Sequence, residues 1–134
     1  MTQLELKERT KKFCIKVIIF LRELPKNEET HVISRQLIKC STSVGANYRA
    51  ACRAKSTADF INKIKIVEEE ADESCFWLEI LIELYGSGTK IEVILKEAKE
   101  LTAIFTATGK TIRNNQYGEC VPEFVVRKGF VVCF

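Results

Sequence analysis

The chain has 134 residues, of which 46% are hydrophobic and 29% charged, with two prolines and six glycines. This length predicts one domain. The apolar content is enough to form a core that needs no stabilising metal ion or disulfide bond. The small number of prolines and glycines indicates long regular secondary-structure elements. The net charge of +3 excludes neither an acidic nor a basic surface, because residues 1–67 carry 14 Lys/Arg and 6 Asp/Glu (+8) whereas residues 68–134 carry 7 and 12 (−5). Two such halves can neutralise each other within a bundle or between subunits, or they can leave a basic face for nucleic acid.

Six cysteines are spread along the chain with no CxxC pair, and His31 is the single histidine, so the pattern does not indicate a zinc site. The cysteines are Cys14, Cys40, Cys52, Cys75, Cys120 and Cys133. The apolar stretch Phe13–Leu21 is interrupted by Lys16 and is far shorter than the roughly 20 residues that span a bilayer. We therefore expect a cytoplasmic protein with reduced, mostly buried thiols, no membrane association, no metal and no cofactor.

The first predicted helix spans about Leu4–Leu24 and is ended by Pro25. Apolar residues recur along one helical face, and three isoleucines broaden that face well past a single stripe. The face contains Phe13, Val17, Phe20, Leu21 and Leu24, and the additional residues are Ile15, Ile18 and Ile19. A helix this apolar is expected to be central or covered on two sides.

The second predicted helix begins near Thr30, which is a suitable N-cap. Its apolar stripe consists of Ile33, Leu37, Cys40, Val44, Tyr48 and Ala51. Small residues surround the later part of this stripe, and they would let a neighbouring backbone approach closely. Among them, Gly45 costs about 1 kcal/mol relative to alanine inside a helix, which suggests a packing role.

The third and fourth predicted helices each begin at a capping-box match, Ser56–Asp59 and Thr89–Glu92. The third carries the clearest heptad pattern of the chain and is ended by Gly86–Gly88. Its stripe is Phe60, Ile64, Val67, Ala71, Ser74, Leu78, Leu81 and Tyr85. The stripe of the fourth runs from Ile91 to Ile112, and the helix is expected to end at Asn114–Asn115.

Four amphipathic helices joined by short loops predict an all-α, antiparallel up-down-up-down four-helix bundle over residues 1–116. The tail, residues 117–134, departs from the helical pattern and is rich in β-branched and aromatic residues after Phe124. It can form a hairpin that turns at Lys128–Gly129, pack on the bundle, swap onto a neighbour or lie outside the domain.

Catalytic patterns are not found. A di-iron bundle needs ExxH motifs, which a chain with one histidine lacks, and only His31 is available as an imidazole base for a nucleophile. There is no GxxxxGK[ST] or GxGxxG loop to bind phosphates. The sequence therefore favours a protein that is not an enzyme.

Basic residues of the second predicted helix and the loop after it are candidates for contacts with a phosphate backbone. They are Arg35, Lys39, Arg49, Arg53 and Lys55, and Lys7, Lys11 and Lys12 add charge on the first helix. The alternative is that these side chains solubilise the helix or pair with the acidic residues of the third helix.

Taken together, the residues from Thr42 to Leu81 resemble the bacterial four-helix bundle protein family, first noticed as reading frames within intervening sequences of large-subunit ribosomal RNA genes. The matching positions are Ser43, Gly45, Ala46, Asn47, Arg49 and Ala51, then Ser56, Asp59 and Phe60, then Glu70, Ala71, Glu73, Trp77 and Leu78. The resemblance covers about residues 5–115. One departure is Ala50, where family members usually have Glu.

The resemblance implies ring-shaped homo-oligomers, often pentamers, without known catalytic activity. A related branch, the accessory variability proteins of diversity-generating retroelements, binds a reverse transcriptase and nucleic acid. In this setting the small residues of the second helix are expected to pack tightly against the third, with Trp77 as a buried anchor. Polar partners at that seam or at a subunit contact are expected to be Asn47, Arg49, Lys63, Glu69, Glu70 and Glu73.

The sequence thus predicts a non-enzymatic, homo-oligomeric binding or scaffold protein that associates with RNA or DNA through basic residues of its first two helices. The alternative is a protein–protein interaction adaptor with no nucleic-acid binding, which would dock through its acidic third and fourth helices or its apolar tail.

Overall fold

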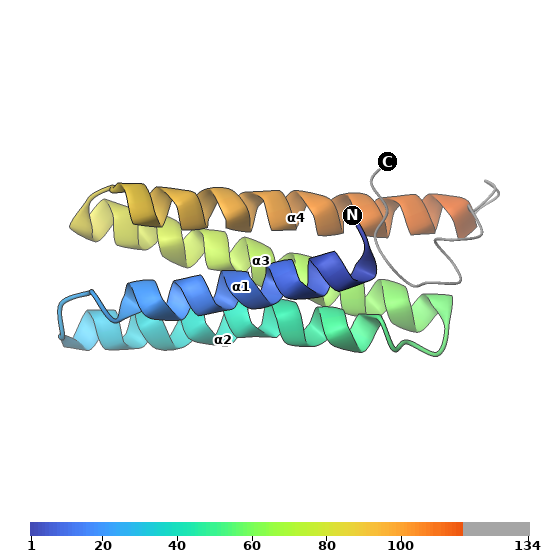
Figure 1. The fold of residues 1–134 in the computed structure, drawn as a ribbon, viewed down its shortest axis with the longest axis horizontal. Helices are drawn as coiled ribbons and strands as arrows, with labels where there is room; N and C mark the ends of the chain where they lie inside the picture. Colours follow the sequence, from blue (N-terminus) through green and yellow to red (C-terminus); the bar gives the residue numbers. More distant parts are fainter. Residues whose placement is uncertain (117–134) are drawn as a thin grey trace.

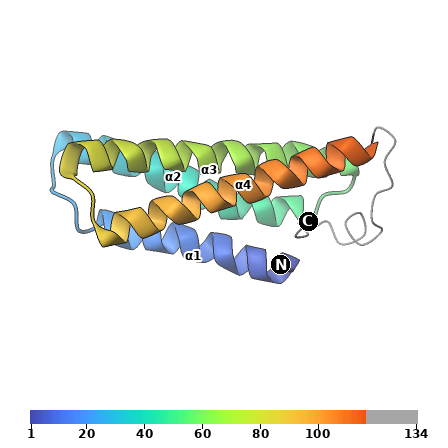
Figure 2. The same cartoon turned by 90° about the horizontal axis from the view of Figure 1, so that it is seen from above.

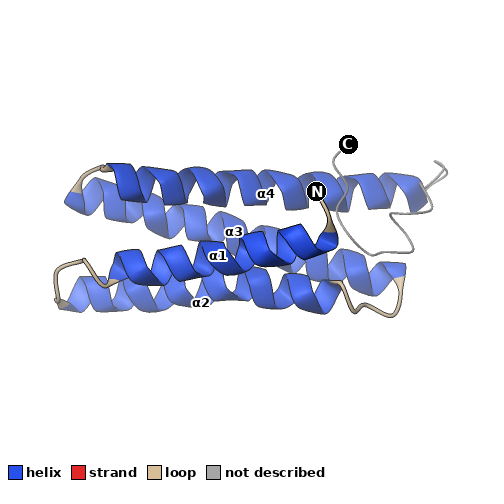
Figure 3. Ribbon diagram, viewed as in Figure 1, coloured by secondary structure: helices blue, strands red, loops and turns tan. Residues whose placement is uncertain are grey.

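The computed structural model describes residues 1–116, which form four α-helices joined by short loops (Figures 1 and 3). They are α1 (Gln3–Leu21), α2 (Glu28–Ala51), α3 (Thr57–Tyr85) and α4 (Thr89–Gln116). Successive helices run antiparallel, so the predicted all-α up-down-up-down bundle is confirmed. The predictions for the tail fall outside the described residues.

Each helix packs on its neighbours in the sequence, and α1 and α4 close the bundle. The seams of α3 with α2 and with α4 are the most extensive, whereas the α1–α4 seam is the thinnest. Seen from above, α1 and α3 lie on opposite sides of the molecule with α2 and α4 between them (Figure 2). The bundle therefore presents four different helix backs to its surroundings.

The core is built from the stripes that the periodicity predicted, and their large side chains are almost fully buried. They include Phe13, Val17, Leu37, Val44, Tyr48, Ile64, Val67, Leu78, Leu81, Leu101 and Phe105. The expectation that the first helix is covered on two sides is wrong for the single chain. α1 is covered on one side, and Ile15 and Ile19 on its back are 44% and 52% exposed.

The start of α2 differs from the predicted one by three residues. Asn27 is the N-cap, and its side-chain oxygen accepts a hydrogen bond from the Thr30 backbone nitrogen at 2.9 Å. The Thr30 hydroxyl oxygen accepts one in return from the Asn27 nitrogen at 3.1 Å, which completes a capping box. A threonine is chemically suited to either position of the box, so residue type alone did not separate the cap from its partner.

Of the two predicted capping boxes of the later helices, the one at Ser56–Asp59 is partly formed and the one at Thr89–Glu92 is not formed. Ser56 caps α3 through a bond from the Asp59 backbone nitrogen at 3.1 Å, but the Asp59 carboxylate accepts from Lys63 instead of from the cap. Thr89 is already inside α4, and the carboxylate of Glu92 accepts from the hydroxyl of Ser87.

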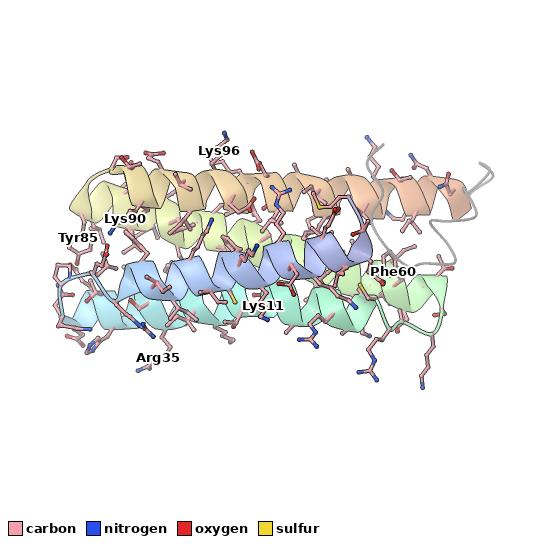
Figure 4. All side chains as sticks on the ribbon, in the orientation of Figure 1. Lys11, Arg35, Phe60, Tyr85, Lys90 and Lys96 are labelled. Atoms are coloured by element: carbon pink, nitrogen blue, oxygen red, sulfur yellow. The ribbon has the colours of Figure 1, made fainter. Side chains whose placement is uncertain are left out.

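Both loops at one end of the bundle are tied together by side chains (Figure 4). Tyr85 at the end of α3 donates its hydroxyl to Glu29 at 2.6 Å, and Lys90 at the start of α4 donates to Glu23 at 2.7 Å. These bonds hold the α1–α2 loop against the α3–α4 connection.

Candidate nucleic-acid interface and subunit contacts

The back of α2 and the turn after it carry exposed basic residues from Arg35 onward. Four of the five cations predicted to bind nucleic acid, Arg35, Lys39, Arg49 and Arg53, fall on the outward positions 35, 39, 42, 46, 49 and 53, which repeat with spacings of four and three. All four are exposed, and Arg35 points away from the bundle in Figure 4. Lys55, the fifth, is exposed in the loop before α3.

The chain segment that carries these cations has no acid of its own, because residues 30–55 contain no Asp or Glu. Among residues 1–116, ion pairs are made by Arg9, Lys63 and Lys90, and none by the five predicted cations. Thr42 and Ala46 occupy the middle of the stripe, so the charge lies in two pairs near the ends of α2.

Helix α1 extends the basic surface. Arg9 points toward α4, where it meets Glu97, so Lys7 and Lys11, two residues to either side, lie on the opposite flank of α1, beside α2. We call Lys7, Lys11, Arg35, Lys39, Arg49 and Arg53 the basic face. The third predicted cation of this helix, Lys12, instead lines the groove between α1 and α4.

Of the polar residues predicted to lie at the α2–α3 seam or at a subunit contact, two make hydrogen bonds within their own helices. Asn47 donates to the Ser43 hydroxyl at 2.7 Å within α2, and Lys63 donates to Asp59 at 2.7 Å within α3. Arg49, Glu69 and Glu73 are exposed.

The carboxylate of Glu70, another of these predicted residues, interacts electrostatically with α2. Burial, reinforced by the charge of Glu73, raises the pKa of Glu70, while the ammonium of Lys39 on α2 opposes that rise. Electrostatic interactions across the seam therefore include Glu70 with Lys39, and Glu70 and Glu73 with the Cys40 thiol, whose pKa is raised by burial and further by both carboxylates.

Trp77 is half-buried rather than fully buried, and it packs edge-on against Phe76 with ring centroids 5.1 Å apart. Its indole nitrogen has no hydrogen-bond partner among residues 1–116. Phe76 itself is 53% exposed, and Leu84 two turns further is 50% exposed. Phe76 and Leu84 are not among the residues predicted from the sequence, although large apolar side chains outside the heptad stripe are a signal that could have identified them.

The small residues of α2 do not act as expected. Gly45 faces α1 rather than α3, because a Cβ built on it would lie 3.5 Å from the Thr10 hydroxyl oxygen. Among the other small residues of this stretch, Ala46 is exposed, Ser43 and Ala50 are half-buried, and Ala51 is buried. The helical position of Gly45 explains why it faces α1. Val44 and Tyr48 point into the core, and position 45 lies to the side of them that faces α1.

A shallow groove of about 680 Å³ separates α1 from α4. Arg9 bridges it, with its Nε 3.0 Å from Glu97 Oε1 and its Nη2 2.7 Å from Glu100 Oε2. The groove is lined by Leu4, Glu5, Glu8, Arg9, Lys12, Phe13, Lys16, Val93, Lys96, Glu97 and Glu100. Four cations and four carboxylates line it, so it holds no single sign of charge.

A family model described as the 23S rRNA-intervening sequence protein matches residues 2–107. This chain belongs to that family. The match covers all of α1 to α3 and most of α4, and it confirms the resemblance carried by the residues from Thr42 to Leu81.

A solved relative supports the family assignment at the level of structure. It is a protein of unknown function from the S23 ribosomal protein family of Bacteroides thetaiotaomicron VPI-5482, with 32% identity and a TM-score of 0.73. The alignment covers 82% of this chain and 99% of the relative. No curated protein matches the chain. The family thus accounts for the bundle but brings no established activity with it.

Three features of residues 1–116 concern metal binding, membrane insertion and thiol reactivity. Among residues 1–116 no three His, Cys, Asp or Glu side chains are grouped to hold a metal ion, and no helix there is long and apolar enough to cross a membrane. Burial raises the pKa of the Cys40 thiol to about 11, and burial also raises the pKa of Cys75 and Cys14. These thiols are therefore protonated near neutral pH, which is unfavourable for a nucleophile.

Proposed function

We propose that this protein is a non-enzymatic, homo-oligomeric bundle that binds RNA or DNA through the basic face of α1 and α2. The observation that carries the proposal is the run of outward cations on α2 without an intervening acid or an ion pair within residues 1–116. Arg35, Arg49 and Arg53 make no ion pair among residues 1–116 and keep their attraction for an external polyanion, whereas Lys39 also interacts with Glu70.

The spacing of these cations suits a phosphate backbone. Arg35 and Arg49 are 14 residues apart, which corresponds to about 21 Å along the helix, or several phosphates of an extended strand. The groups between them, Thr42 and Ala46, offer little for reading base edges. We therefore expect binding that is weakly dependent on base sequence and strongly dependent on salt.

The direct test is fluorescence anisotropy of nuclease-treated protein with short labelled RNA and DNA at about 50 and 200 mM salt. If all six cations of the basic face are engaged, the affinity falls by up to about 10³-fold between these concentrations. The double variant Arg49→Glu with Arg53→Glu should reduce affinity at least tenfold and flatten the salt dependence.

Lys65→Glu with Lys110→Glu is the matched control, because it changes the net charge equally at exposed positions of α3 and α4. Circular dichroism checks that both variants remain helical. Equal losses in the two variants would show that net charge, and not the basic face, is responsible, and no binding by the wild type would reject the nucleic-acid proposal.

Homo-oligomerisation is proposed from the exposed apolar side chains. Ile15 and Ile19 on α1 and Phe76 and Leu84 on α3 are each about half exposed, and adjacent exposed apolar residues of this size mark interaction surfaces. The resemblance leads us to expect a pentamer. Light scattering coupled to size exclusion measures the mass, and a monomer at micromolar concentration would reject this part of the proposal.

A second candidate function is protein binding without nucleic acid, which the acidity of α3 favours. Residues 68–83 carry seven acids and no base, and exposed apolar residues lie among them. If the anisotropy measurement detects no nucleic acid at either salt concentration, this adaptor function becomes the better account of the fold.

A further inference from the structure

The back of α1 carries an apolar strip flanked by cations, with the exposed Glu8 and Glu23 beyond its two ends. Ile15 and Ile19 lie one turn apart and point away from the core. Residues 11–22 carry Lys11, Lys12, Lys16 and Arg22 and no acid, which gives a local charge of +4. We call Ile15 and Ile19 with these four cations the α1 face.

The back of α3 is an apolar strip inside an acidic surround. Phe76, Ile80 and Leu84 follow one another at helical spacing, and the first and last are about half exposed. Residues 68–83 carry seven acids and no base, a local charge of −7. We call these three apolar residues, with the exposed Glu69, Glu73 and Glu83, the α3 face.

Electrostatics decides how two copies can meet. In a two-fold symmetric contact each face would meet itself, so that lysines would oppose lysines or glutamates would oppose glutamates. Like charges placed opposite each other across an interface cost several kcal/mol. A contact of the α1 face with the α3 face instead buries apolar side chains on both sides and pairs cations with carboxylates at the rim.

The dimensions of the faces also agree. The segment 11–22 is about 17 Å long and the segment 69–84 about 23 Å, by the rise of an α-helix. The two faces lie on opposite sides of the bundle, as Figure 2 shows for α1 and α3. Each copy can therefore engage one neighbour through α1 and another through α3.

We propose that the occupant of the α3 face is the α1 face of a second copy of this chain, so that the protein assembles head to tail. This inference rests on the proposed homo-oligomer and specifies its interface. A head-to-tail contact closes into a ring or continues as a chain, depending on the rotation between neighbours. Because α2 lies between α1 and α3 along one side, the cations of the basic face on α2 stay open on the same side of every copy, whereas Lys11 belongs to both faces and lies at the edge of the contact.

Two variants with one damaged face each provide the test. Ile15→Glu with Ile19→Glu damages the α1 face, and Phe76→Glu with Leu84→Glu damages the α3 face. All four positions are exposed, so helicity should be unchanged by circular dichroism. Each variant alone should be a monomer by light scattering at a concentration where the wild type is an oligomer.

Mixing the two variants distinguishes a head-to-tail contact from a two-fold symmetric contact. An equimolar mixture should form a one-to-one heterodimer, because each variant contributes one intact face, and this dimer cannot grow further. A two-fold symmetric contact would give no heterodimer and would leave one of the variants self-associated. Val93→Glu, at an exposed apolar position of α4 outside both faces, is the control and should keep the wild-type mass.

The outcomes separate the two proposals. A monomeric wild type overturns both the homo-oligomer and this interface. An oligomeric wild type whose face variants keep its mass, or fail to form the heterodimer, overturns the head-to-tail interface alone.

Discussion

Gly45 lies where α2 meets α1, in ordinary van der Waals distance of its neighbours. A Cβ built there would be 3.5 Å from the Thr10 hydroxyl oxygen and 3.7 Å from the Thr10 backbone carbon, so the seam has room for a methyl group. The close approach of the two helices therefore does not require glycine, although glycine weakens α2.

Gly45→Ala is accordingly expected to stabilise the protein by about 0.5–1 kcal/mol, the usual helix-propensity gain. Urea unfolding followed by circular dichroism measures the change. Gly86→Ala is a useful contrast, because Gly86 ends α3 at a φ of 89°, where a side chain is strained, and it should destabilise. A lower free energy of unfolding for Gly45→Ala would show that the seam is tighter than its contacts indicate.

The buried thiol of Cys40 should make the free energy of unfolding depend on pH in the alkaline range. Burial raises the pKa of its thiol from 9.0 to about 11, and the folded state therefore favours the neutral form. That contribution is fully present below pH 9 and is lost as the pH rises through 11, reaching a loss of about 2 kcal/mol near pH 11.

The variant Cys40→Ala isolates this effect, because its other titrating groups are the same. Its free energy of unfolding should be lower at pH 8, since a buried side chain is shortened, but should decline less steeply between pH 8 and pH 11. Urea midpoints at these pH values provide the comparison, and parallel declines in the two proteins would contradict the assignment to Cys40.

At the scale of elements, α1 is held to α4 by few contacts, and Arg9 is central among them. Its guanidinium binds both Glu97 and Glu100, and its side chain is 25% exposed. The bond to Glu97 raises the pKa of Arg9, with burial opposing that rise. A multiply bonded arginine is stronger than a single surface ion pair, so the cluster should contribute measurably to the seam.

A double-mutant cycle with Arg9→Met and Glu97→Gln should give a coupling energy of about 0.5–1.5 kcal/mol, obtained from urea unfolding of the four proteins. The cycle with Lys63→Met and Asp59→Asn, an i,i+4 pair within α3, should give about 0.3–0.5 kcal/mol. A coupling at Arg9 no larger than that of the local pair would mean that packing alone holds α1 to α4.

The elements themselves were largely predictable, and their contacts with one another were not. Heptad spacing located α3 and α4 and the buried stripe of each helix, because burial acts on side chains three and four residues apart. Arg9 and Glu97 are 88 residues apart, and no local pattern links them. Gly45 is a second example. Its small size was evident from the sequence, but which helix it faces depends on how each of the four helices is rotated about its axis in the bundle.

At the scale of the whole molecule, the broad apolar pattern on α1 fits a contact with a second copy of the chain better than it fits the core of a single chain. Ile15 and Ile19 led to the prediction of a helix covered on two sides, and the single chain covers only one. A second copy whose α3 face meets α1 would supply the missing cover. The uneven charge of the two halves has a matching explanation, since basic α1 and acidic α3 are kept apart within a chain and meet between chains.

Assembly and nucleic-acid binding should consequently be linked through avidity. In a head-to-tail assembly the basic faces lie side by side, so a long strand can contact several copies, whereas an oligonucleotide of about 10 nucleotides contacts one. The monomeric variant Phe76→Glu with Leu84→Glu, altered on α3 away from the basic face, should bind the short strand within about threefold of wild type. A strand of about 60 nucleotides should be bound about 10²-fold more weakly than by wild type.

Fluorescence anisotropy at a single salt concentration measures the affinity for both strands, and the short strand controls for the added negative charge of the variant. Equal losses for both lengths would show that the substitution acts on the basic face itself, and equal retention would show that each copy binds independently of its neighbours.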